Sequence, residues 1–272
     1  MPKSAAHRFS LRVVITGRTA RTAVWRGIAG LLVSAAVFFA QPATTFLTNA
    51  MGMNEQAYET RLGDQRHLHL EDGSNIILNT DSEIRVRISP QKREIQLIRG
   101  EALFIAAPDS SRPFDVHAGG NVVRALGTRF SVRIRQEHRI DVLLAEGKLA
   151  LYASEDSGEM ASGEYAILQR GKITIDTMDP WQLDGRLAWT NGILVFSGEP
   201  LDEVIMEFNR YNTRKLSIGD ATLNDEPVSG RFRATDIVTF VALLKQLGAR
   251  PAETSAHAEA DIRIIRIPPG GR

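Results

Sequence analysis

The sequence predicts a mainly β protein with three parts: a single N-terminal membrane-spanning helix, an all-β domain, and a small α+β module containing two strand–helix repeats. Three observations predict this organisation. An uncharged apolar run follows a basic N-terminal segment, short alternating segments with frequent turn residues fill residues 65–176, and two amphipathic helical stripes recur at a constant offset. We expect the all-β part to be a sandwich, a barrel or a coil-like stack of strands.

The N-terminal part is basic and then apolar. Six cations lie in residues 1–26, and no charged residue occurs between position 27 and position 54. A spanning helix needs ~20 mostly apolar residues, which residues 27–47 supply. Cations on its N-terminal side place that side in the cytoplasm. We therefore expect a basic cytoplasmic segment at 1–26, a transmembrane helix at 27–47 and a linker at 48–64. A signal peptide cleaved before Met51 is the alternative.

The composition narrows the function classes. Taking those six cations from the 33 basic residues leaves 27 basic against 32 acidic residues in the rest of the chain. A mildly acidic body argues against a nucleic-acid partner. The chain has no cysteine, which excludes disulfides, thiol nucleophiles and cysteine-bound metals.

The segment 65–176 has the pattern of many short strands. Its apolar residues alternate with polar ones, turn pairs such as Asp72-Gly73 and Gly119-Gly120 separate the runs, and no helical period persists for three turns. We expect this segment to form one domain, with strands within 66–70, 75–79, 83–89, 94–99, 102–107, 113–118, 123–135, 140–153 and 164–175.

In one of these predicted strands, VRALGTRFSV, the apolar residues change between odd and even sequence positions, which we call a change of parity. Apolar residues occupy odd positions up to Ala125 and even positions from Phe130 onward, with Gly127-Thr128 between them. A strand with one buried face keeps its parity, and a β-bulge is the usual way to shift it. We predict a bulge at Gly127 and inward-facing side chains on both sides of it, namely Val123, Ala125, Phe130, Val132 and Ile134.

After a linker at 177–191, residues 192–267 predict an α+β module, followed by a frayed tail at 268–272. Pro200 suits the first turn of one helix, and Gly248 the end of another. Each helix carries an apolar stripe, and adding 36 to every position of the first stripe gives the second. The stripes are Leu201, Val204, Ile205, Phe208 and Tyr211, and then Ile237, Phe240, Val241, Leu244 and Leu247.

Few residues suggest chemistry. His67 and His69 share one strand face with Glu71, a spacing that can hold a metal, but two solvent-facing histidines is the favoured interpretation. No catalytic motif, phosphate loop or dinucleotide fingerprint occurs, so we expect neither an enzyme nor a bound metal or cofactor. We expect Phe104, Phe114, Phe130 and Tyr165 in the core. The arginines at 85, 87, 124, 129, 133 and 135 predict a solvated strand face, with an anion-binding face as the alternative.

Several blocks, in order, now support a family resemblance. LEDGSNIILNTDSEIRV and then IQLIRGEALFIAAPDSSRPFDVHAGGNVVRALGTRFSVR resemble the FecR domain, with its DGS turn and its GEA-F, RPF-V-A and R-A-LGT-F-V segments. The resemblance covers about residues 65–175. The C-terminal repeat, with FSGEPLDEVIMEFNRYN and VSGRFRATDIVTFVALLKQLG, resembles the short N-terminal module of secretins and TonB-dependent transporters.

The resemblance implies a non-enzymatic, single-pass regulator in the inner membrane of a Gram-negative bacterium. Such proteins relay a signal to an extracytoplasmic-function sigma factor in the cytoplasm. The signal comes from the signalling domain of a TonB-dependent outer-membrane transporter, typically one for iron or siderophore uptake, and is received in the periplasm. We expect that domain to pair with a strand edge of the C-terminal module, at the candidate contact residues Val195, Phe196, Arg231, Phe232 and Arg233.

The chain departs from the FecR pattern at its N-terminus. The family carries a longer helical sigma-binding region before the membrane helix, whereas residues 1–26 occupy that place here, with Trp25 at their edge. An upstream start, a lost region and a short basic peptide that does the same work are the three alternatives. A membrane-anchored periplasmic scaffold or envelope-ligand binder without a sigma-factor partner is the alternative function.

Overall fold

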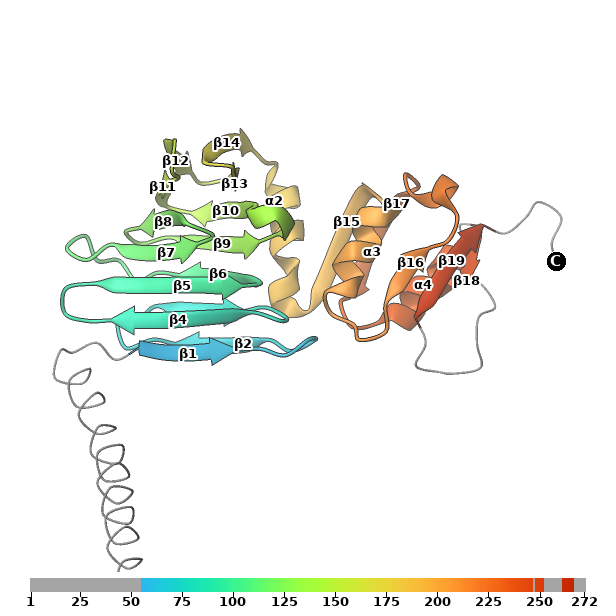
Figure 1. Cartoon of the computed structure of the whole chain (residues 1–272), viewed down its shortest axis with the longest axis horizontal. Helices are drawn as coiled ribbons and strands as arrows, with labels where there is room; N and C mark the ends of the chain where they lie inside the picture. The colour runs from blue at the N-terminus through green and yellow to red at the C-terminus, as the bar shows by residue number, and fades with distance from the viewer. Residues whose placement is uncertain (1–54, 247, 252–260, 267–272) are drawn as a thin grey trace, which may run out of the picture. The chain divides into compact units, whose positions relative to one another are not determined.

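The computed structural model describes residues 55–246, 248–251 and 261–266, and Figure 1 shows their arrangement. The described part consists mostly of strands, so the mainly β prediction is confirmed. The membrane-spanning helix predicted at 27–47 lies outside the described residues. Among the helices of the described ranges, none combines the length and the apolarity that crossing a membrane requires.

Two seven-stranded sheets form the β domain, and Figure 1 shows them as two layers. All neighbouring strands run antiparallel except β5 and β7, which are parallel. The first sheet contains, in spatial order, β1 (Glu55–Glu59), β4 (Glu83–Ile88), β5 (Arg93–Arg99), β7 (Phe114–Ala118), β8 (Asn121–Ala125), β11 (Lys148–Tyr152) and β12 (Ser157–Ala161). The second contains β14 (Lys172–Thr177), β13 (Glu164–Gln169), β10 (Ile140–Glu146), β9 (Arg129–Ile134), β6 (Glu101–Ile105), β3 (Asn75–Leu78) and β2 (Arg66–His69).

The side chains between the two sheets form one apolar core, so the β domain is a sandwich. Three fully buried phenylalanines lie in it, as the sequence predicted. The rings of Phe104 and Phe130 stack with centroids 5.2 Å apart, and Phe114 lies 6.0 Å from Phe104. Tyr165 is not part of this core: it is only partly buried and lies on the other face of the second sheet.

The parity change at Gly127 is a sheet crossing, and the predicted bulge is wrong. Strand β8 ends at Ala125 in the first sheet, and β9 begins at Arg129 in the second. Both strands turn their apolar residues toward the shared core, which confirms the inward-facing prediction on each side. The inner faces of the two sheets point toward each other. The apolar residues therefore change from odd to even positions when the chain crosses from the first sheet to the second. A Cβ atom on Gly127 would lie 3.1 Å from Pro108 Cα, so this corner is closely packed.

Structure extends into both segments expected to be linkers. Strand β1 begins at Glu55 and pairs with β4, and Tyr58 packs against the sandwich core. Its sequence EQAYE lacks a clear apolar alternation because an edge strand needs few buried side chains. In the second linker, α2 (Pro180–Leu187) and the 3₁₀ turn η2 (Ala188–Asn191) follow the sandwich. Gln182 and Asp179 form a capping box at the start of α2.

In its described residues the C-terminal module contains two α-helices and two small sheets, and Figure 1 shows α3 and α4 among their strands. Strand β15 pairs with β17 antiparallel, while β19 pairs with β16 in parallel and with β18 antiparallel. A short 3₁₀ turn, η3 (Ala221–Leu223), also occurs in the module, and another, η1 (Gln136–His138), occurs in the sandwich. The module's other elements are β15 (Ile193–Pro200), α3 (Leu201–Asn209), β16 (Leu216–Ile218), β17 (Pro227–Arg233), α4 (Ile237–Gln246), β18 (Ala249–Pro251) and β19 (Ile262–Arg266).

The apolar stripes of the two repeated helices lie in one shared core. Every described residue of both stripes is buried, and Leu247 lies outside the described residues. The rings of Phe208 on α3 and Phe240 on α4 stack with centroids 4.3 Å apart. This second core also includes Leu103 of β6, on the face of the second sheet that points away from the sandwich core. The sandwich and the module are therefore packed together.

Candidate functional site

All five predicted contact residues lie on the two-stranded sheet of β15 and β17. Val195 stands opposite Arg231 in the antiparallel register. Phe196 is 8% exposed, and its ring lies 6.1 Å from that of the partly buried Phe232. Arg231 and Arg233 are exposed, and Val195 is partly exposed. The two phenylalanines thus stabilise the module by packing, while the arginines are available to a partner.

Strand β17 has an open hydrogen-bonding edge. Within the described ranges its one strand partner is β15, so the main-chain groups on its other side have no strand to pair with. Its exposed side chains alternate along the strand at Pro227, Ser229, Arg231 and Arg233. Such an edge can accept an added strand through main-chain hydrogen bonds.

A buried carboxylate joins the sandwich to helix α3. Glu101, at the start of β6, is 4% exposed, and its Oε2 accepts a hydrogen bond from Asn79 Nδ2 at 2.9 Å. Arg210 Nη2, at the end of α3, donates to the same oxygen at 2.8 Å. Asn79 Nδ2 also donates to Tyr211 Oη at 2.9 Å. These bonds fasten the first helix of the module to the sandwich.

A second carboxylate extends this junction network. Glu207 lies 2.9 Å from Arg133 Nη2 and 2.5 Å from Arg210 Nη1. Burial disfavours its charged form, but Arg210 and Arg133 outweigh burial and lower the pKa of Glu207 to about 2. Burial likewise opposes the charge of Arg210, and Glu207 and Glu101 outweigh it and raise the pKa of Arg210. Burial raises the pKa of Tyr211. Two cations and two carboxylates balance in this network.

Arg133 corrects the prediction of a solvated arginine face. Its side chain is 16% exposed and ion-paired to Glu207 of the module. Arg85, Arg87 and Arg124 remain exposed on the outer face of the first sheet, as predicted. The difference arises because the module covers the outer face of the second sheet only.

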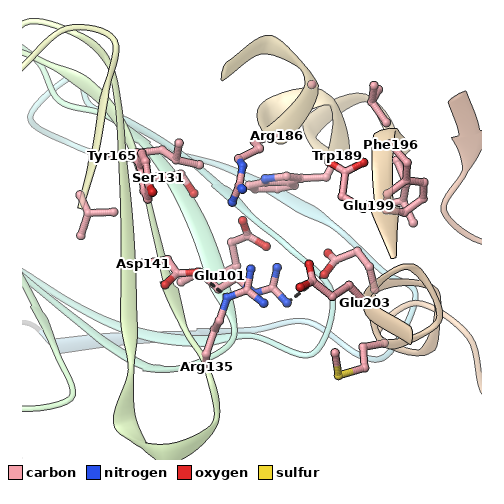
Figure 2. A pocket seen from close by; sticks show the side chains of 18 of the residues that line it. Glu101, Ser131, Arg135, Asp141, Tyr165, Arg186, Trp189, Phe196, Glu199 and Glu203 are labelled. Carbon is pink, nitrogen blue, oxygen red and sulfur yellow. Dashed lines mark hydrogen bonds and ion pairs between the residues drawn. The ribbon is translucent and has the colours of Figure 1, made fainter. Parts of the chain in front are cut away.

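A cleft lies where the sandwich, α2 and the module meet, and Figure 2 shows the side chains around it. Its volume is about 480 Å³. The sandwich contributes residues from β6, β9, β10 and β13, including Tyr165. The module contributes residues from β15 and α3, and Trp189 of η2 also lines the cleft.

Two polar groups in this cleft lack the partners that such groups normally have. Trp189 is 3% exposed, and its buried Nε1 donor has no hydrogen-bond acceptor in the part of the chain that the structure describes. A buried donor left without an acceptor costs about 1–3 kcal/mol. The guanidinium of Arg186 stands 5.9 Å from the centroid of the Tyr165 ring and has no carboxylate within salt-bridge distance among the described residues.

The alternative interpretation of His67 and His69 as metal ligands finds no support in the geometry around β2. His67 and His69 are exposed, on the opposite side of the strand from the buried Leu68, which is the favoured interpretation of their spacing. His69 Nδ1 lies 2.8 Å from Asn75 Oδ1. The described ranges contain no group of three or more histidine, cysteine, aspartate and glutamate side chains suited to hold a metal ion.

The comparisons with known proteins agree with this architecture. A family model described as "FecR protein" matches residues 56–150. The chain carries a FecR domain. This match begins within β1 and ends within β11 of the sandwich, so the FecR likeness that the sequence blocks predicted is found in this part of the chain. A search among curated proteins gave no match.

Two crystal structures of a candidate anti-sigma factor from Parabacteroides distasonis share the fold of the chain. Each superposes with a TM-score of 0.65 at 22% sequence identity, and covers 78% of this chain and 99% of the other. At this identity the likeness concerns the fold alone. Because the covered part exceeds the FecR match, the shared fold includes more than the sandwich.

The junction residues escaped the sequence analysis although they lie in conspicuous blocks. Asn79 belongs to NIILNTDS, Glu101 to the GEA segment, and Arg210 and Tyr211 to FNRYN. The pattern of each block indicated a strand, a turn or a helix. A polar residue directly next to an apolar strand run was the available signal. Its partner lies more than 100 positions away, so the sequence could not reveal the pairing.

Proposed function

We propose that this FecR-family protein is a non-enzymatic, single-pass regulator of a sigma factor in the bacterial inner membrane. Its N-terminus would lie in the cytoplasm, and the sandwich and the module in the periplasm. The FecR domain, joined to a module with an open strand edge, is the observation that carries this proposal. The fold shared with a candidate anti-sigma factor supports it.

We further propose that the module receives the signal, and that the signalling domain of a TonB-dependent outer-membrane transporter supplies it, in iron or siderophore uptake. The partner would add a strand to the open edge of β17. Arg231 and Arg233, which are exposed on this strand, would then contact side chains of the partner. No cofactor is required for such a relay.

The regulatory role is tested in the native host. Deleting the gene should change the transcripts of one extracytoplasmic-function sigma factor, and a chromosomal copy of the gene should restore them. Transcript levels of all such sigma-dependent genes are measured by RNA sequencing. Unchanged transcripts for every extracytoplasmic-function sigma factor would contradict the proposal.

The docking edge is tested with a matched pair of double substitutions. The full chain is reconstituted in nanodiscs, and its affinity for a purified transporter signalling domain is measured by calorimetry. Arg231→Glu with Arg233→Glu should weaken binding about tenfold or more, which corresponds to ~1.4 kcal/mol. Arg85→Glu with Arg87→Glu places the same change on a strand of the sandwich and should leave the affinity unchanged. Equal effects of the two pairs would remove β17 as the docking edge.

A further inference from the structure

We propose that the cleft between the sandwich, α2 and the module binds a short peptide that carries a free carboxylate and a free amino group. The cleft encloses about 480 Å³, and small-ligand sites in proteins enclose ~300–1,000 Å³. Its walls come from strands of the sandwich and from residues 185–207, which include the end of α2 and the start of the module. An occupant therefore contacts the sandwich and the module at the same time. This site is separate from the open edge of β17.

One side of the cleft has positive charge in excess. Arg186 has no carboxylate partner within the described ranges, and its guanidinium lies over the Tyr165 ring. Arg135 and Arg139 both pair with the same carboxylate, Asp141, so this group keeps one uncompensated positive charge. Guanidinium groups bind carboxylates through two parallel hydrogen bonds. This side is suited to the carboxylate of a ligand.

The other side has negative charge in excess. Glu199 and Glu203 line the cleft, and neither has a basic partner in the part of the chain that the structure describes. Glu199 accepts a hydrogen bond from the backbone N–H of Ser197, which leaves its charge uncompensated. Glu199 belongs to β15 and Glu203 to α3, and Figure 2 shows both glutamates across the cleft from Tyr165 and Asp141. This side is suited to an ammonium group.

Several apolar side chains and one serine hydroxyl also line the cleft. Ser131 of β9 is 2% exposed, and its hydroxyl makes no hydrogen bond to any described residue. Such a hydroxyl can donate to, or accept from, the amide groups of a peptide. The apolar side chains that line the cleft are Leu143, Ile167, Ile193, Val195 and Met206.

The charge arrangement selects this class of ligand over simpler ones. Glu199 and Glu203 repel a simple anion, and Arg186 repels a simple cation. A ligand with both charges at the ends of a short body satisfies both sides, and amide groups between them match the buried Ser131. A short peptide with free ends is the chemical class that has all three features.

Three probes test the site on the full chain in nanodiscs by calorimetry. They are trialanine, trialanine with an amidated C-terminus, and trialanine with an acetylated N-terminus. Free trialanine should bind most tightly, and each blocked form should bind about tenfold more weakly because one charge pairing is lost. Absence of heat from all three probes at about 10 mM, a concentration that saturates even a millimolar site, would overturn the proposal.

Substitutions assign each end of the peptide. Arg186→Gln should abolish the preference for the free carboxylate over the amide and keep the preference for the free amine. Glu203→Gln should do the reverse. Arg170→Gln and Glu155→Gln, whose residues lie outside the cleft, should keep both preferences. Unaltered preferences in both cleft variants would mean that these charges only hold the module in place, and would also overturn the proposal.

A filled cleft gives an independent test. Gly185 of α2 lines the cleft, and a Cβ atom there would make an ordinary contact, 3.5 Å from Val195 Cγ1. Gly185→Leu should therefore keep the fold, with a melting temperature at or above that of the parent, because leucine favours a helix more than glycine does. It should abolish trialanine binding. Binding that survives in a folded Gly185→Leu variant would place the probe outside the cleft.

Discussion

The sandwich and the C-terminal module differ in how much structure supports each strand. The sandwich closes one large core between two seven-stranded sheets. The module has only a two-stranded and a three-stranded sheet in the described residues, and a two-stranded sheet is marginally stable by itself. Helix α3 compensates by docking on the sandwich through the junction network of Asn79, Glu101, Arg133, Glu207, Arg210 and Tyr211. The comparison indicates that the sandwich is stabilised by its own core, whereas the module depends on its contacts with the sandwich for its position.

The largest expected effect comes from removing one aromatic ring from each core. Phe104→Ala in the sandwich and Phe240→Ala in the module should each lower the free energy of unfolding by about 3–5 kcal/mol, because both side chains are fully buried. Denaturant unfolding measures the change. If the junction couples the two regions, both variants shift the same single transition. Leu126→Ala, at a residue that is 51% exposed, should change the stability by less than ~0.5 kcal/mol.

Breaking the junction should separate the two regions. Arg210→Met leaves Glu101 buried without a cation and should cost about 2–4 kcal/mol. We expect the single unfolding transition to split, with the module unfolding first. Adding Glu101→Gln to this variant should recover part of the loss, and the double-mutant cycle measures the coupling between the two residues. Strictly additive effects would show that the ion pair does not couple them.

The junction should also make stability depend on pH in a defined window. The pKa of Glu207 is about 2 in the folded protein, below its ordinary value of 4.5. The unfolded chain therefore binds the proton more tightly, and the stabilisation is fully present above pH 4.5. It is lost as the pH falls from about 4.5 to about 2, and amounts to about 3 kcal/mol.

Two glutamine variants on α3 isolate this effect. Stability curves between pH 2 and pH 6 should be flatter for Glu207→Gln than for the parent. Glu203→Gln, on the same helix but exposed and without an ion pair, should follow the parent curve. Parallel curves for the parent and Glu207→Gln would exclude Glu207 as the source of the acid sensitivity.

The smallest effect concerns the corners of the sandwich. Gly147 joins β10 to β11 with a φ of 96°, and a Cβ atom there would lie 2.6 Å from Thr128 Cγ2. Gly163 has a similar φ of 88° but nothing within 4 Å of that position. Gly163→Ala should cost about 1 kcal/mol for the left-handed backbone, and Gly147→Ala about 2 kcal/mol because of the added clash. Thermal unfolding compares them, and equal costs would mean that the corner is not closely packed.

Local pattern predicted the elements well where one face of a strand or helix is buried. The alternation in EIRVRIS matches the burial of Ile84 and Val86 in β4, and the stripes of α3 and α4 are buried as expected. The pattern failed where burial comes from a distant segment. Arg133 looked like one more exposed strand arginine, but Glu207 of the module covers it. Tyr165 looked like core, but it faces the cleft.

The sequence by itself determined that residues 65–176 are rich in strands, and it also gave rise to the FecR resemblance, the repeated helices and the inward-facing residues around Gly127. These follow from local periodicity, which acts over a few neighbouring residues. Only the tertiary structure decided that Gly127 marks a sheet crossing, that Glu101 pairs with Arg210, and that a cleft forms beside α2. Such features depend on which distant faces pack together. That choice is made by the burial of whole surfaces and not by any local pattern of residues.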